Sequence, residues 1–286
     1  LLHPERPKLM FVRTTPAGAQ DETVYLSGSS LKGVVRASAE RVLRSLAVEQ
    51  RAMQAACDPL DQKGRCQREL RERGDSLSLQ SGGPERMAEV HKKLCLACRT
   101  FGSNALGSRV QFADAYPPVG VARERANTVE LRNSVAIDRR TGGPAHGALL
   151  DFGVVTGGHF ETQIHLSNFE LWQLALVLLV LDEINEGFTR VGANKSRGLG
   201  RMAATVQQVV IDQARGADGK VAGVGVLLPS LAGQYGWLER QGMDAAVVSE
   251  TTPLGPRFVY EAKALKGLRA GLFGAPWEAL CAETAR

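Results

Sequence analysis

The sequence predicts an α+β fold with helices on one face of a sheet. Segments with strand or helix periodicity follow in the order strand, helix, strands, helix, strand, and the second helix is apolar on nearly every side. This order fits a ferredoxin-like sandwich, which requires a further strand before the first helix. Because only residues 1–27 precede that helix and the chain begins with Leu1 rather than Met, we expect part of that strand to lie upstream.

Length and composition exclude several classes of protein. The chain has 286 residues, of which 44% are hydrophobic and 6% aromatic, as in a globular protein with a sizeable core. Wholesale disorder, a collagen-like fibre and a disulfide miniprotein are therefore excluded. The longest strongly apolar run, Leu174–Leu181, is too short for a bilayer, which needs about 20 residues. The net charge of +5 is compatible with nucleic acid but does not require it.

The first half of the chain begins with a short strand at Val24–Leu26. Regularly spaced apolar residues then predict a helix from about 30 to 50, which Ser29 or Ser30 can cap at its N-terminus. A second strand follows at Arg109–Tyr116 and ends at two consecutive prolines. The first half of the chain is therefore predicted to contain a strand, a helix and a second strand.

The second half contains the buried helix. Residues 120–150 are irregular and basic, and His159–Leu166 is a predicted strand. The tetrapeptide Ser-Asn-Phe-Glu at 167–170 has the pattern of a capping box and opens a helix from about 168 to 186. A last strand is predicted at Arg201–Ile211, and the sequence beyond it is less regular.

Four of the five cysteines have the spacing of a zinc site. Cys95 and Cys98 form a C-x-x-C pair, and Cys57 and Cys66 form a looser pair upstream. Four thiolates can surround zinc tetrahedrally, and the polar segment 58–94 between the pairs could not build a core without a metal. The alternative is a redox C-x-x-C pair with unrelated cysteines.

The five histidines give no defined site. His91 could replace Cys57 as a zinc ligand, but a surface histidine on a charged helix is the preferred interpretation. His146 and His159 could indicate metal-free ribonuclease chemistry, although the five scattered histidines form no defined pair. Nothing indicates secretion, so we expect no disulfide framework and a cytoplasmic location.

Two glycine-rich segments could contact phosphate. The first, Gly28–Gly33, lies at a helix start, where free N–H groups, the helix dipole, Lys32 and Arg36 would attract an anion. Alternatively, it is simply a capped helix start. The second, Gly192–Gly200, carries two cations among glycines that allow a polyanion to approach the backbone. Alternatively, it is a flexible loop between a helix and a strand.

Taken in order, several motifs are more specific than either segment alone. They are Gly28–Arg36, Phe101–Ser103, Arg109–Ala115, Ile137–Thr141 and Ser196–Gly200. Together they resemble the RAMP superfamily of CRISPR–Cas proteins and, within it, the repeating backbone subunit of type III effector complexes. The resemblance covers roughly residues 10–211, and the four-cysteine segment at 54–100 resembles the zinc-binding insertion of some members.

The resemblance implies a fold and a set of partners. The core, residues 1–212, would be of the RNA-recognition type, with a zinc-binding insertion at 54–100 and a projecting β-hairpin thumb at about 120–150. Residues 213–286 would be a C-terminal extension that packs on the core or on a neighbouring subunit. Such subunits stack along a guide RNA, and the thumb kinks the duplex formed with complementary target RNA. Partners would include copies of the chain or related RAMP subunits and other CRISPR effector subunits, with no membrane.

The resemblance also assigns residues to RNA. The implied contacts come from the helix start, the thumb and the second glycine-rich loop. They are Ser29, Ser30, Lys32, Arg36, Arg139, Arg140, Lys195, Ser196 and Arg197. Backbone contacts of this kind bind any sequence, as a guide carrier requires.

Cleavage of target RNA is a separate question. In many such subunits an aspartate ahead of the Gly-Ser-Ser motif cleaves with a divalent cation, but the matching position near Lys8 has none. Asp21 is the best available carboxylate, but a solvated turn residue is the preferred interpretation. We therefore expect RNA binding with structural zinc, and Mg²⁺ only if the protein cleaves. The alternatives are a metal-dependent endoribonuclease that cuts target RNA at regular intervals and a zinc-stapled α+β interaction module.

Overall fold

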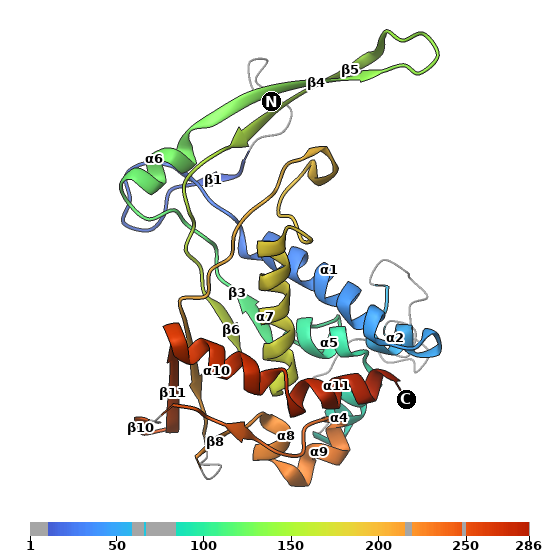
Figure 1. The fold of residues 1–286 in the computed structure, drawn as a ribbon, viewed down its shortest axis with the longest axis vertical. Coiled ribbons are helices and arrows are strands. Elements are labelled where there is room, and N and C mark those ends of the chain that lie inside the picture. The colour runs from blue at the N-terminus through green and yellow to red at the C-terminus, as the bar shows by residue number, and fades with distance from the viewer. Residues whose placement is uncertain (1–10, 59–65, 67–83, 215–218, 248–249, 286) are drawn as a thin grey trace. The chain divides into compact units, whose positions relative to one another are not determined.

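The computed structural model describes most of the chain (Figure 1). The described ranges are residues 11–58, 66, 84–214, 219–247 and 250–285. Helices and short strands alternate along the chain, which confirms the α+β class. Contacts group the chain into two compact units, here called unit 1 (Leu1–Leu31 with Phe112–Ile164) and unit 2 (Lys32–Gln111 with His165–Arg286). The boundary at residue 212 suggested by the sequence stays a prediction.

Unit 1 contains two antiparallel strand pairs and one short helix. Strands β1 (Arg13–Thr14) and β2 (Thr23–Val24) pair with each other, and helix α6 (Val121–Asn127) contacts β2. Strands β4 (Val129–Ile137) and β5 (Pro144–Val155) form a long hairpin with an irregularity in register at Val135. No side chain of β4 is buried.

The expectation of irregular structure over residues 120–150 is therefore wrong. The segment contains α6 and most of a hairpin, and the sequence hides both for one reason. Only Ala126 of α6 is buried, and β4 has no buried face, so neither element needs the regular apolar spacing by which buried elements are recognised.

Unit 2 holds the central helices. Helix α1 (Gly28–Leu46) enters it from unit 1, and η1 (Glu49–Arg51) and α2 (Ala52–Ala55) follow. Helices α4 (Pro84–Lys93) and α5 (Leu96–Phe101) carry the second half of the cysteine segment. Strands β3 (Val110–Phe112) and β6 (Ile164–Leu166), which each have one residue in unit 1, pair, and β6 leads into α7 (Leu171–Glu186).

The rest of unit 2 comes from the C-terminal third of the chain. The 3₁₀ helix η3 (Lys195–Arg197) precedes a three-stranded sheet in the order β10–β11–β7. The remaining elements are β7 (Gln208–Asp212), β8 (Lys220–Val221), α8 (Val224–Leu227), α9 (Pro229–Tyr235), β9 (Met243–Asp244), β10 (Glu250–Thr252), β11 (Gly255–Glu261), α10 (Ala262–Leu272) and α11 (Ala275–Ala285). Helices α10 and α11 both contact α7.

The main core of unit 2 forms around α7. This helix is apolar on nearly every side, and Leu171, Leu174 and Leu178 are buried together with Phe258 of β11 and Leu268 of α10. Each such side chain contributes roughly 1.5–3 kcal/mol through removal from water. The segment beyond residue 212 thus supplies much of the apolar surface that covers α7. No helix in the described ranges combines the length and apolarity that a bilayer crossing demands.

The caps of both long helices differ from the predicted ones. Helix α1 begins at Gly28, and the Ser27 hydroxyl, rather than Ser29 or Ser30, accepts the Ser30 N–H at 3.3 Å. Helix α7 begins at Leu171, and its N-cap is Glu170, which forms a capping box with Gln173. In each case a chain with several Ser, Asn or Glu residues offers competing caps, and packing selects among them.

Candidate metal centre and nucleic-acid-binding segments

Four cysteines form a buried cluster in unit 2. The sulfur atoms of Cys57, Cys66, Cys95 and Cys98 all lie within 4.8 Å of one another, and each residue is buried. Within the described ranges they are the one group of three or more His, Cys, Asp or Glu side chains placed to share a metal ion. The predicted cysteine cluster is confirmed, although the two pairs are separated by 28 residues of sequence.

Local geometry brings the sulfurs together and prepares them for a cation. Cys95 is the N-cap of α5, and its Sγ accepts the Cys98 N–H at 3.4 Å, which closes the C-x-x-C turn. The Cys57 N–H donates to Cys95 Sγ at 3.4 Å, and the Cys95 N–H donates to Cys66 Sγ at 3.3 Å. Donors directed at sulfur stabilise thiolate, which is the form that binds metal.

The dimensions of the cluster fit zinc. Cys57 Sγ lies 3.6 Å from both Cys98 Sγ and Cys95 Sγ. Four sulfurs at the usual Zn–S distance in a tetrahedron would lie ~3.8 Å apart. Because all four positions are taken by protein sulfur, zinc here would have a structural role and no open coordination site. Zinc would join α5 to the segment that follows α2.

The four thiols perturb one another. Hydrogen bonds with Cys57, Cys66 and Cys95, together with burial, raise the pKa of the Cys98 thiol. Hydrogen bonds from the other cysteines lower the pKa of Cys95. Zinc ligation requires deprotonated sulfur at all four positions, so metal binding releases protons and weakens at acid pH.

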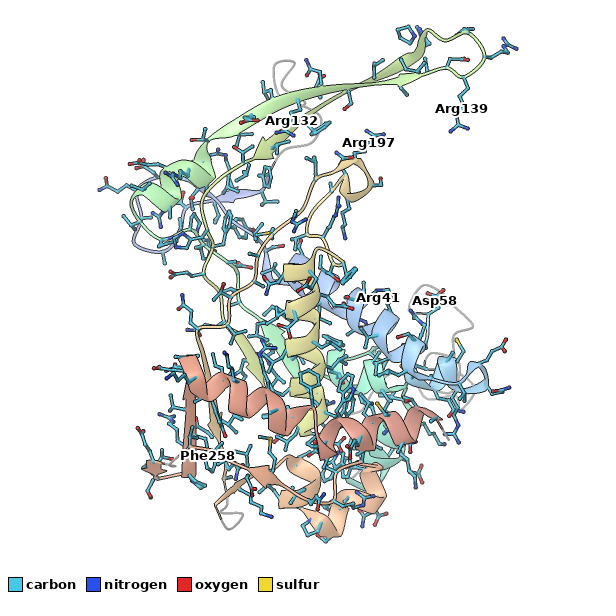
Figure 2. All side chains as sticks on the ribbon, viewed as in Figure 1. Arg41, Asp58, Arg132, Arg139, Arg197 and Phe258 are labelled. Atoms are coloured by element: carbon cyan, nitrogen blue, oxygen red, sulfur yellow. The ribbon has the colours of Figure 1, made fainter. Side chains whose placement is uncertain are left out.

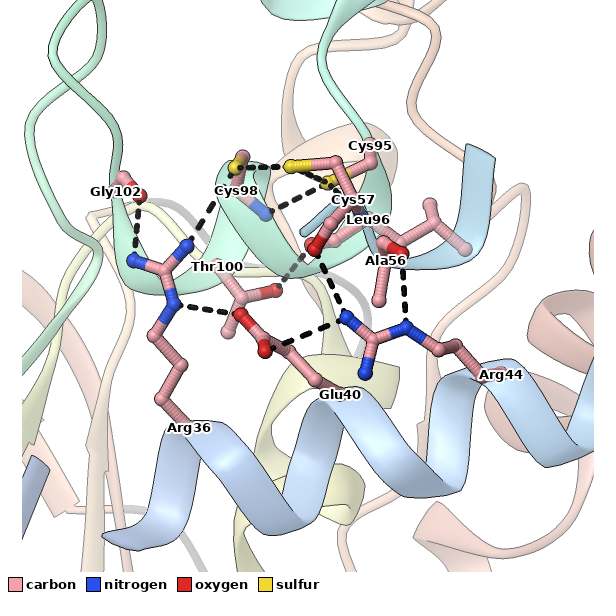
Figure 3. A network of polar contacts seen from close by, with 10 residues as sticks. All are labelled: Arg36, Glu40, Arg44, Ala56, Cys57, Cys95, Leu96, Cys98, Thr100 and Gly102. Carbon is pink, nitrogen blue, oxygen red and sulfur yellow. Dashed lines mark hydrogen bonds and ion pairs between the residues drawn. The ribbon is translucent and has the colours of Figure 1, made fainter. Parts of the chain in front are cut away.

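Helix α1 presents three charged side chains to the cysteine cluster (Figure 3). The Arg36 guanidinium donates to Glu40 Oε1 at 2.8 Å, to the Gly102 carbonyl at 3.0 Å and to Cys98 Sγ at 3.6 Å. Arg44 donates to the carbonyls of Ala56 at 3.1 Å and Cys57 at 2.9 Å. The spacing of Arg36, Glu40 and Arg44 places all three on one face of the helix.

The charge on Arg36 is well supported. Burial works against it, but the hydrogen bond and the negative charge of Glu40, together with the hydrogen bond to Cys98, raise the pKa of Arg36. Its side chain is only 23% exposed. The structure therefore places this predicted RNA ligand beside the cysteine cluster, with all its guanidinium nitrogens engaged.

His91 is buried, which corrects the prediction of a surface histidine. Its Nδ1 lies 2.8 Å from the Tyr235 carbonyl, and its Nε2 lies 3.1 Å from a guanidinium nitrogen of Arg109. Burial and the charges of Arg99 and Arg109 lower the pKa of His91 to about 3. It is a neutral hydrogen-bonding residue of the interior and lies outside the cysteine cluster. The many charged residues of α4 made His91 look like a surface residue. The helix nevertheless contacts α9, and His91 lies on a buried side.

The Gly-Ser-Ser helix start is closely packed within unit 1. A Cβ atom on Gly28 would lie 2.2 Å from the Phe112 carbonyl oxygen, so only glycine fits there. The Gly28 N–H donates to Asp114 Oδ1 at 2.7 Å, which occupies the first of the free N–H groups. Ser29 and Ser30 are exposed, and their hydroxyl oxygens lie 3.2 Å and 2.8 Å from the Ser27 hydroxyl oxygen.

Lys32 lies one turn farther along α1 and is half-buried. Burial and the nearby Arg36 charge lower the pKa of Lys32. Its assignment as an RNA contact stays a prediction.

The second glycine-rich segment forms a defined loop. Asn194 and Gly198 both adopt left-handed backbone conformations on either side of η3. Gly200 has a φ of +80°, and a Cβ there would lie 2.3 Å from the Val191 carbonyl oxygen. The Val191 N–H donates to the Gly200 carbonyl at 2.9 Å and closes the base of the loop.

This loop presents Lys195, Ser196 and Arg197, which are all exposed (Figure 2, which labels Arg197). Arg190 donates to the Lys195 carbonyl at 2.9 Å and holds the turn from inside. Neither Lys195 nor Arg197 forms an ion pair with any part of the chain that the structure describes. The two cations lie in a turn that is bounded by left-handed backbone at Asn194 and Gly198.

The hairpin turn carries the other predicted RNA-binding pair. Arg139 and Arg140 are exposed between β4 and β5, and Figure 2 labels Arg139 at the tip. Asp138 Oδ1 accepts the N–H groups of Arg140 at 2.7 Å and Thr141 at 3.0 Å, which fixes the turn. These backbone hydrogen bonds lower the pKa of Asp138. The exposed apolar side chains Leu131 and Ile137 lie on β4.

Asp21 lies in the exposed connection between β1 and β2. Among the described residues it belongs to no group of three or more acidic, histidine or cysteine side chains that could share a metal ion. The structure thus shows no assembled divalent-cation site around the carboxylate that the sequence singled out.

Several residues with clear structural roles at these sites were missed by sequence reasoning. They are Ser27, Glu40, Arg44 and Asp114. The spacing of Arg36, Glu40 and Arg44 was a readable signal for a shared helix face. The pairing of Asp114 with Gly28 had no signal, because it depends on how distant segments meet.

Comparison with known proteins agrees with the order of these motifs. No curated protein matches the chain. The sequence model of the RAMP superfamily matches residues 10–203, a range that includes α1, the cysteine cluster, the hairpin and the second glycine-rich loop. The chain therefore belongs to the RAMP superfamily, and membership implies an RNA-binding subunit of a CRISPR–Cas complex.

Proposed function

We propose that this protein is a guide-RNA-binding backbone subunit of a type III-like CRISPR effector complex. The observation that carries the proposal is the loop of η3, where Lys195 and Arg197 are exposed, unpaired within the described ranges, and held by left-handed backbone at Asn194 and Gly198. Cations so placed suit a phosphate backbone without regard to base sequence, which is what a carrier of variable guides needs.

The fold assignments belong to the same proposal. In it the core is of the ferredoxin-like, RNA-recognition type, and residues 213–286 are a C-terminal extension that packs on the core or on a neighbouring subunit. The hairpin β4–β5 acts as the thumb. Its exposed Leu131, Val135 and Ile137 would wedge between bases, while Arg139 and Arg140 meet phosphates at the tip. Copies of the chain, related RAMP subunits and target RNA are the proposed partners.

Binding of RNA by the loop is tested by salt dependence. The double variant Lys195→Ala/Arg197→Ala should bind single-stranded guide RNA more weakly. The negative slope of log affinity against log salt should become less steep by ~1.4. Arg257→Ala is a matched control, because Arg257 already pairs with Asp212 at 2.6 Å and 2.9 Å. An unchanged slope in the double variant, with normal folding, would contradict the proposal.

The alternatives predict different results with the same material. An interaction module without an RNA role predicts purified protein whose ratio of absorbance at 260 to 280 nm shows no nucleic acid. A metal-dependent endoribonuclease predicts a ladder of evenly spaced target cuts with Mg²⁺, lost in Asp21→Ala. We propose binding without cleavage, so the complex with guide and labelled target RNA should retain intact target in Mg²⁺.

A further inference from the structure

With zinc bound, the cysteine cluster would carry a buried negative charge that its four ligands do not neutralise. Zinc with four thiolates carries a net charge of −2, and all four cysteines are buried. A buried charge of this kind needs oriented donors or cations close to it. Backbone N–H groups of Cys57, Cys95 and Cys98 supply three donors to sulfur. The remaining compensation must come from charged side chains.

Helix α1 supplies two cations at different points of the cluster. Arg36 reaches Cys98 Sγ directly, at 3.6 Å from its Nη2. Arg44 reaches the ligand backbone instead, through the carbonyls of Ala56 and Cys57. The two guanidiniums therefore act on opposite halves of the ligand set, one on the C-x-x-C half and one on the upstream half.

Glu40 holds both arginines in these positions. Its carboxylate lies 2.8 Å from Arg36 Nε and 3.6 Å from Arg44 Nη2, and its side chain is only 8% exposed. A buried carboxylate between two arginines fixes their planes, so each fork is directed at the cluster before any metal arrives. Figure 3 shows the three side chains between α1 and α5.

We propose that Arg36 and Arg44, oriented by Glu40, are positioning residues of a zinc–tetrathiolate centre, and that Arg36 does not contact RNA. Arg36 lowers the electron density on the Cys98 thiolate, and Arg44 holds the Cys57 backbone in the ligating conformation. Both slow the loss of zinc. This inference does not depend on the proposed RNA function.

The kinetics of zinc release test the proposal. Arg36→Gln should release zinc to a chromophoric chelator ~10-fold or more faster than the unchanged protein, as for other partners that orient metal ligands. Arg36→Lys keeps the charge but loses the planar fork, so its rate should be intermediate. Arg41→Gln is the matched control, because Arg41 lies on the same helix but pairs with Glu183 at 2.7 Å.

A spectroscopic readout separates positioning from a general loosening of α1. With cobalt in place of zinc, Arg36→Gln should shift the sulfur-to-metal charge-transfer band to longer wavelength, because the thiolate loses its charged donor. Arg41→Gln should leave the band in place. If Arg36→Gln proves unable to fold, Arg36→Lys carries the same comparison at smaller amplitude.

Two results would overturn the inference. One is a zinc release rate and cobalt spectrum that are unchanged in Arg36→Gln or Arg36→Lys. The other is a tenfold loss of RNA affinity in zinc-saturated Arg36→Gln with normal zinc release, which would identify Arg36 as an RNA contact. The expected result is guide-RNA affinity within about twofold of the unchanged protein.

Discussion

The arginines of α1 and the cations of the η3 loop come from equally basic, glycine-flanked motifs, yet the structure uses them differently. Arg36 makes three directed contacts, with Glu40, Gly102 and Cys98. Arg197 is exposed in a loop whose conformation is set by left-handed residues. The comparison teaches that basic residues in a motif divide into those that stabilise the fold and those that remain available for an anion.

The largest effect on stability is expected from removal of a cysteine ligand near the α1 arginines. Cys98→Ser should abolish tight zinc binding and lower the free energy of unfolding by about 4 kcal/mol or more, because the cluster then leaves buried thiols without a metal. Metal analysis and thermal unfolding measure both effects. Cys281→Ser is the control, since Cys281 is half-exposed and lies outside the cluster. Equal unfolding temperatures for the two variants would show that the cluster does not stabilise the fold.

A second test concerns Glu239, a buried carboxyl group that would lack sufficient compensation if it were ionised. Burial and the nearby Glu170 raise the pKa of Glu239 to about 8, and its Oε2 has no hydrogen-bond partner in the described structure. Its folded pKa thus exceeds its unfolded value, so its contribution to stability is present below about pH 4.5 and is lost as pH rises through about 8.

Glu239→Gln should remove this pH dependence. Between about pH 5.5 and 7 the unchanged protein should lose about 1.4 kcal/mol of unfolding free energy per pH unit relative to the variant. Denaturant unfolding with zinc present throughout measures the difference. Parallel pH profiles for the two proteins would mean that Glu239 is ionised in the fold at pH 7.

The third test asks whether the η3 loop must keep its conformation to bind RNA. Gly200→Ala should cost roughly 1–3 kcal/mol and weaken RNA binding, because its Cβ would meet the Val191 carbonyl and its φ is positive. Gly198→Ala has a similar φ of +89° but open space around the added Cβ, so it should be milder. Unfolding curves and RNA titrations of both variants separate the steric clash from backbone strain alone.

The smallest stability effect is expected at the hairpin tip. Arg139→Ala/Arg140→Ala should change the free energy of unfolding by less than about 0.5 kcal/mol, since both side chains are exposed. Binding of the guide–target duplex should nevertheless become less dependent on salt. A large loss of stability would show that Arg139 and Arg140 stabilise the fold, as Arg36 of α1 does, rather than remain available for an anion.

The sequence predicted elements with a strong apolar period and residues with a strong chemical constraint. Helix α7 was found because nearly every side is apolar, and the cysteine cluster because four thiols have few alternatives. The residue pattern missed helix α6 and strand β4 because they bury almost nothing, and only the family resemblance implied a hairpin in this segment. The limits lie in elements whose stability comes from pairing rather than from a core.

Side-chain roles were harder to predict than elements. Arg36 and Lys195 both belong to basic motifs that contain glycines, and only the fold distinguishes a cation beside thiols from one in solvent. His91 looked like a surface residue because its neighbours on α4 are charged, yet that helix buries one side. Tertiary contacts between distant segments, such as Gly28 with Asp114, leave no local signal.

One measurement tests the division of cations most directly: the salt dependence of guide-RNA affinity for Arg197→Gln and Arg36→Gln, both saturated with zinc. Each change removes one positive charge from a basic motif. We predict that the negative slope of log affinity against log salt becomes less steep by ~0.7 in Arg197→Gln and stays unchanged in Arg36→Gln. A reduced slope in Arg36→Gln with an unchanged slope in Arg197→Gln would contradict the account.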